Sequence, residues 1–210
     1  MIKVVNVLDA KRRNINLKHT RDGIYYFHDY YPTRYRRISD EDIELRQKIW
    51  QYKDIETTEV VMDFTEEMME ALTHIVDKCK YRNIGLVAVP PSKTYKSSAV
   101  RMSIRLLYKW YEMNITKRMY KCNKKVYDFG ELLTRQSDIS TSHRGRRATY
   151  EEQMESIRCS KDNLNKYNMA FIILDDVTTT GTSMDVCRDI LIEHGCPEDA
   201  IYRMAIARTV

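Results

Sequence analysis

Two adjacent carboxylates, Asp175 and Asp176, begin the segment of the chain best suited to chemistry. Four consecutive apolar residues, 171–174, precede them and predict a strand that is buried on both faces. Hydroxyl residues follow, and after Ser183 the pattern becomes helical. The amides of such a turn and the positive end of the helix dipole can hold a phosphate, while the carboxylates can accept hydrogen bonds from vicinal hydroxyls. The segment predicts a sugar-phosphate site, with the phosphate bound by Thr178, Thr179, Thr180, Gly181, Thr182 and Ser183.

The simpler interpretation of this segment is an ordinary strand–loop–helix corner whose threonines and serine only cap the helix. Capping needs a single hydroxyl. It explains neither the paired acids nor the run of hydroxyl residues. The phosphate site is therefore the favoured interpretation.

Residues 171–183, FIILDDVTTTGTS, resemble the phosphoribosyl-pyrophosphate (PRPP) signature of the type I phosphoribosyltransferases (PRTases). The shared features are an apolar strand, two acids, two variable positions and TTGT-like hydroxyls. The resemblance implies the α/β fold of that family, a central, mostly parallel sheet flanked by helices. It also implies a small N-terminal hood, residues 1–60, on a PRPP-binding core, residues 61–210, the whole forming one compact domain.

The activity that the resemblance implies is Mg²⁺-dependent transfer of ribose 5-phosphate from PRPP to a nucleophile, with release of pyrophosphate. Asp175 and Asp176 would be catalytic, binding the ribose hydroxyls and reaching the metal through these hydroxyls or through water. Purine-salvage members carry an Asp at the position of Thr179, which argues against a hypoxanthine/guanine enzyme. The hood would select the acceptor, and no motif in it identifies that molecule.

Two further segments are candidates for handling the leaving pyrophosphate. Pro91, Ser92 and Lys93 match the pyrophosphate loop of the family by position, although Lys93 could equally be a solvated surface lysine. A lid is expected within 137–149, where Arg144 and Arg147 would add positive charge and exclude water. For each arginine alone, an ordinary exposed role is the alternative.

Three other segments resemble the ComF-like, amidophosphoribosyltransferase-like branch of the family. They are AVPPSK at 88–93, AIARTV at 205–210 and YKD at 52–54. Two features of that branch are missing. The chain has no N-terminal zinc-binding cysteine cluster, and SSAVRMS stands in place of an RGFNQ-like segment.

Charge and cysteine content bear on partners and compartment. The net charge is +5, but residues 93–147 alone hold fourteen Lys/Arg against four Asp/Glu. Such a basic region suits pyrophosphate and would equally suit nucleic acid, so a non-catalytic PRPP or nucleotide sensor that binds nucleic acid is the alternative function. The five cysteines show no CxxC spacing, which favours free thiols in the cytoplasm. No signal peptide or membrane span is expected, and family members are often homodimers.

The remaining patterns predict the elements that position this site. Residues 1–30 should form a β-hairpin or meander, with a strand at 2–8 and a turn at Asp22-Gly23. The alternation of strands and helices favours βαβ units and a parallel sheet. The segment 115–126 is basic and poorly patterned. Helices are expected from Ser39, over about 65–80, over about 98–112 and over 148–158, and further strands at 84–91 and at 200–210.

Overall fold

A computed structural model of the chain describes residues 17–35, 37–116, 124–139 and 148–210. Its centre is a six-stranded sheet in which every neighbouring pair is parallel except the first. The strand order is β1 (Lys18–His19), β2 (Ile24–Tyr30), β8 (Ile201–Thr209), β7 (Met169–Thr178), β3 (Asn83–Ala88) and β4 (Lys125–Asp128). This mixed α/β architecture with a mostly parallel central sheet confirms the predicted fold class at that level.

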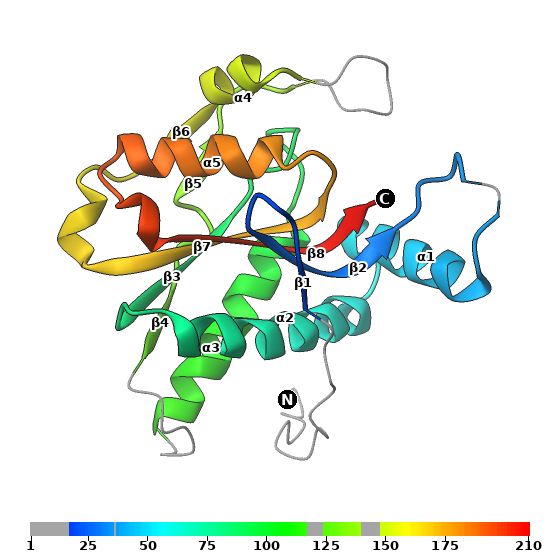
Figure 1. Cartoon of the computed structure of the whole chain (residues 1–210), viewed down its shortest axis with the longest axis horizontal. Helices are drawn as coiled ribbons and strands as arrows, with labels where there is room; N and C mark the ends of the chain where they lie inside the picture. Colours follow the sequence, from blue (N-terminus) through cyan, green and yellow to red (C-terminus); the bar gives the residue numbers. More distant parts are fainter. Residues whose placement is uncertain (1–16, 36, 117–123, 140–147) are drawn as a thin grey trace.

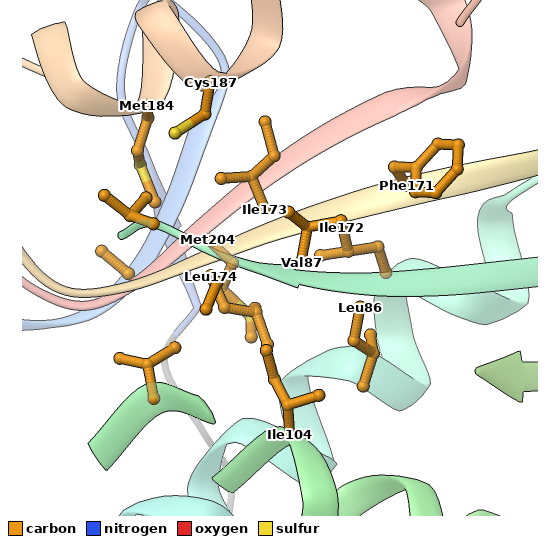
Figure 2. Packing of buried hydrophobic residues seen from close by; sticks show 14 of the residues in the cluster. Leu86, Val87, Ile104, Phe171, Ile172, Ile173, Leu174, Met184, Cys187 and Met204 are labelled. Carbon is orange, nitrogen blue, oxygen red and sulfur yellow. The ribbon is translucent and has the colours of Figure 1, made fainter. Parts of the chain in front are cut away.

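Helices cover both faces of the sheet (Figure 1). On one face lies α5 (Thr182–Glu193), with α4 (Tyr150–Ser156) beside it, and on the other lie α2 (Thr58–Lys78) and α3 (Ala99–Thr116). Figure 2 shows Met184 and Cys187 of α5 on one side of β7, and Ile104 of α3 on the other side. Because β7 is covered on both faces, residues 169–174 are all buried, as the consecutive apolar residues predict.

The N-terminal part of the chain joins the same sheet. β1 and β2 form the predicted hairpin, and Gly23 in its turn has a φ of 76°. β2 then pairs in parallel with β8. The strand expected at 2–8 lies outside the described residues, and the division into a hood of residues 1–60 and a core stays a prediction.

The predicted helices are present, but three have displaced boundaries. α3 continues to Thr116 rather than ending near residue 112, and α4 is shorter than the predicted 148–158 because residues 157–159 form a strand. α1 (Asp40–Asp54) begins at a capping box formed by Ser39 and Asp42. α2 begins at Thr58 rather than near Thr65, because the Thr57 side chain accepts a hydrogen bond from the Val60 amide and caps about two extra turns. Within the described residues no helix is long and apolar enough to cross a membrane.

Short strands account for what the sequence patterns leave unassigned. β4 begins at the end of the poorly patterned basic segment 115–126, and only Val126 of its four residues is buried, so it shows no useful alternation. β5 (Leu133–Arg135) and β6 (Ile157–Cys159) form a separate antiparallel pair. Two short 3₁₀ turns, Leu164–Tyr167 and Glu198–Ala200, precede β7 and β8.

Candidate functional site

The acidic pair lies at the carboxyl end of β7, beyond the point where β3 stops. Ala88, the last residue of β3, is opposite Leu174, and the amide of Val89 still donates to the Leu174 carbonyl. Asp175 and the residues after it pair only with β8. The strand therefore continues through Thr178, whereas the sequence pattern predicts that the loop begins directly after the acids. In open α/β sheets, ligands bind at this edge, outside the carboxyl ends of the strands.

Lys53, at the end of α1, contacts the acidic pair. Its Nζ lies 3.1 Å from Oδ1 of Asp176, and both side chains are about one third exposed or less. Burial by itself lowers the pKa of Lys53, but the carboxylates of Asp176 and Asp175 outweigh it and leave that pKa raised. Lys53 is therefore cationic at neutral pH. In the sequence, Lys53 is part of the YKD segment that resembles the ComF-like branch, but no pattern there indicates a role for it in the site.

The two carboxylates differ in electrostatic environment. Burial raises the pKa of Asp175, the like charge of Asp176 raises it further, and Lys53 partly offsets both effects. The Asp175 side chain accepts a hydrogen bond from the Asp176 amide at 2.9 Å, and the Asp176 side chain accepts one from the Val177 amide at 2.6 Å. These local bonds fix the direction of both carboxylates.

Gly181 turns the chain from β7 into α5. Its φ is 86°, in the left-handed region that glycine adopts without steric cost, and it is the N-cap residue of α5. A Cβ at this position would lie 2.8 Å from Cδ1 of Ile24 on β2. Both the conformation and the close approach therefore require glycine here.

The first turn of α5 is suited to an anion. No side chain caps it. The amides of Met184 and Asp185 both donate to the carbonyl of Gly181. The preceding amides of the turn lie at the positive end of the helix. The Thr180 and Thr182 hydroxyls are 2.8 Å apart beside them.

The predicted phosphate-binding residues differ in their exposure to solvent. Thr179 and Thr180 are exposed, whereas Thr178 is buried. The hydroxyl of Ser183 donates to Oε1 of Gln153 at 2.8 Å and so ties α5 to α4.

The loop after β3 is held by the last residue of β5 and by residues that follow this strand. Arg135, which is buried, donates from Nε to the Pro91 carbonyl at 2.8 Å, and the Ile139 amide donates to the Ser92 carbonyl at 3.0 Å. Lys93 lies 3.3 Å from the carboxylate of Asp138. Because β3 and β7 are adjacent and parallel, this loop lies next to the acidic pair. No sequence pattern distinguishes Arg135 from the other arginines of the basic region.

Asp138 organises the loop as well as pairing with Lys93. The Thr94 amide donates to its Oδ1 at 2.8 Å, and that bond, together with Lys93, lowers the pKa of Asp138. Arg144 and Arg147, the lid residues expected to be catalytic, lie outside the described residues.

The residues present fit a magnesium ion held jointly with a substrate. Among the described residues, no group of three or more His, Cys, Asp or Glu side chains is placed to bind a metal by itself. Mg²⁺ is commonly bound by one or two carboxylates together with substrate phosphates, and Asp175 with Asp176 meets that requirement.

Comparison with known proteins adds no family assignment: no protein-family model matches the chain, and no curated protein sequence matches it.

Proposed function

We propose that this protein is a Mg²⁺-dependent phosphoribosyltransferase that transfers ribose 5-phosphate from PRPP to a nucleophile and releases pyrophosphate. The observation that carries the proposal is one juxtaposition. Asp175 and Asp176 lie near the carboxyl end of β7, and Gly181, five residues after Asp176, precedes α5, which has no side-chain cap. Carboxylates for two ring hydroxyls and amides for a phosphate are thereby placed at one edge of the sheet.

The binding of the donor follows from this arrangement. The carboxylates of Asp175 and Asp176 accept hydrogen bonds from the two ribose hydroxyls, and the amides of residues 180–183 with the Thr180 and Thr182 hydroxyls receive the 5-phosphate. The pyrophosphate extends toward residues 91–93. Mg²⁺, when bound, neutralises charge on the leaving pyrophosphate.

The reaction breaks the bond from ribose C1 to the pyrophosphate oxygen and forms a bond from C1 to the nucleophile. The Lys53 ammonium group lies 3.1 Å from Oδ1 of Asp176 and offsets negative charge at the acidic pair before the donor arrives. Lys93 can transfer from Asp138 to the departing pyrophosphate, because this ion pair is about one third exposed and therefore weak. Both lysines act through charge at fixed positions, as expected where leaving-group stabilisation dominates.

The test is pyrophosphate release from PRPP in the presence of MgCl₂ and pooled nitrogen nucleophiles. The variant Asp175→Asn/Asp176→Asn should keep the fold and lose both the release and the PRPP-dependent rise in melting temperature. Asp63→Asn/Asp77→Asn removes the same charge from exposed positions of α2 and is the matched control. No release above background hydrolysis by the unmodified protein would refute transfer to these nucleophiles.

A PRPP or nucleotide sensor that binds nucleic acid is the second candidate. The observation in its favour is that Lys53 and Lys93 each form an ion pair with an aspartate. Neither lysine is therefore positioned solely to bind the phosphates of PRPP. It requires salt-dependent binding of DNA or RNA that responds to PRPP. Absence of binding at low salt would remove this candidate.

A further inference from the structure

A pocket separate from the acidic pair lies beside β4, the edge strand of the sheet, with β3 between it and β7. Its volume is about 770 Å³, which is within the range of small-molecule sites. α3 forms one wall, and the turn at 128–132 forms another. Residues 160–161 after β6 close the remaining side. All of the lining residues are distinct from those of the Asp175–Asp176 site.

The charged groups of this pocket leave two cations without a carboxylate partner. Arg105 is neutralised by Glu131, at 2.6 Å. Within the part of the chain that the structure describes, neither Arg101 nor Lys161 makes an ion pair. Asp128 is the other carboxylate of the lining, and its Oδ1 accepts a bond from the Gly130 amide at 2.8 Å.

Arg101 is the residue that points most directly to an anion. It donates through one terminal nitrogen to the Leu133 carbonyl at 3.1 Å, but its Nε is buried and has no acceptor among the described atoms. A buried donor without an acceptor is costly and rare. Burial also lowers the pKa of Arg101, so a bound anion would relieve the unfavourable charge.

The rest of the lining is aromatic. Tyr108 on α3 and Tyr127 and Phe129 at the end of β4 are all half-buried lining residues. Half-buried rings offer flat apolar surface, on which a planar base can stack. A pocket that combines unpaired cations with aromatic walls is chemically matched to a phosphate joined to a planar ring.

The pocket is also connected to the loop that follows β3. Leu132 lines it, and the Leu133 carbonyl that accepts from Arg101 begins β5. Two residues later, Arg135 holds the Pro91 carbonyl. An anion that moves the Arg101 side chain would therefore act on β5 and through it on residues 91–93.

We propose that this pocket binds a free nucleotide, with its phosphate on Arg101 and its base against the aromatic walls, and that this binding regulates the donor site through β5. The binding stands on the pocket alone, whereas the regulation rests on the function proposed above. A mononucleotide is favoured over a nucleic-acid strand because Asp128 and Glu131 place negative charge in the lining, where a phosphate backbone would pass.

The experiment measures binding of AMP, GMP, CMP and UMP by calorimetry, with inorganic phosphate and a twelve-residue thymidylate strand for comparison. At least one mononucleotide should bind more tightly than phosphate. Arg101→Gln should weaken this binding at least tenfold, and Arg158→Gln, which changes an exposed arginine outside the pocket, should leave it unchanged. If Arg101→Gln fails to fold, Lys161→Gln at an exposed position should weaken binding severalfold.

The variant Asp175→Asn/Asp176→Asn separates the two sites. It should keep nucleotide binding while losing the response to PRPP, and the nucleotide should change PRPP affinity in the unmodified protein but not in Arg101→Gln. The proposal is overturned if no mononucleotide binds, if binding survives Arg101→Gln and Lys161→Gln, or if the strand binds tenfold more tightly than every mononucleotide. Arg101-dependent binding without pyrophosphate release would refute the transferase alone.

Discussion

Asp175→Asn is expected to stabilise the ligand-free protein at neutral pH. Burial and the charge of Asp176 raise the pKa of Asp175, so ionising this carboxyl opposes folding. Each pKa unit corresponds to about 1.4 kcal/mol. Because Asp175 keeps some contact with water, we count only part of this shift, roughly 1–2 kcal/mol, which for a chain of this size is about 3–6 °C in melting temperature.

The sign of the pH dependence makes this prediction specific. A raised pKa gives stability that is present below the ordinary pKa, near 4, and is lost as the pH rises through the raised value. Asn is neutral throughout, so its advantage should be small near pH 4 and should grow as the pH rises through the raised pKa of Asp175. Its Oδ1 can still accept the bond that the Asp176 amide now donates to Asp175.

Thermal melts from pH 4 to 8, without PRPP, measure the difference. Asp176→Asn is the matched control, because it removes the partner of Lys53 and should not stabilise the protein. If Asp175→Asn melts at or below the unmodified protein at pH 7.5, the electrostatic account of this site is wrong. A difference that stays constant from pH 4 to 8 would refute it equally.

Two further changes test the geometry around the acidic pair. Gly181→Ala should lower the free energy of unfolding by about 1–3 kcal/mol in urea titrations, because alanine is strained at a φ of 86° and its Cβ would meet Ile24. Adding Ile24→Val should recover part of that loss, and no destabilisation by Gly181→Ala would contradict the described turn. PRPP-dependent stabilisation should be lost at acidic pH, where Asp175 is protonated. Lys53→Met should shift the pH of this loss up by about one unit in thermal melts with PRPP, since Lys53 favours ionised Asp175. A loss that stays at the same pH would show that Lys53 does not influence Asp175.

Local sequence patterns were sufficient for the centre of the fold. Residues 171–174 are apolar without interruption, and such a segment is stable only between two layers of helices. The acids directly after it had to lie at the carboxyl end of that strand. The 91–93 loop was assigned by its position in the family resemblance, and it lies beside the acids because β3 pairs directly with β7, although β4 comes between them in the chain.

The features that could not be predicted depend on contacts between distant residues. Lys53 meets Asp176 only because α1 ends beside β7, and its neighbours in sequence carry no sign of this. β7 extends through Thr178 because β8 pairs with it there, which depends on a strand near residue 205. Arg135 resembles the other arginines of a basic region until the fold brings it to Pro91.

The pairing of β2 with β8 sets an order of assembly. Ile24 lies opposite Arg203, so closing this pair costs about 4–5 kcal/mol of chain entropy for the intervening loop, and it can occur only after nearly all of the chain is available. α1 and its Lys53 follow β2 directly. The side of the site that supplies this cation should therefore form last and open first. Amide hydrogen exchange should be faster in β2 and α1 than in β7.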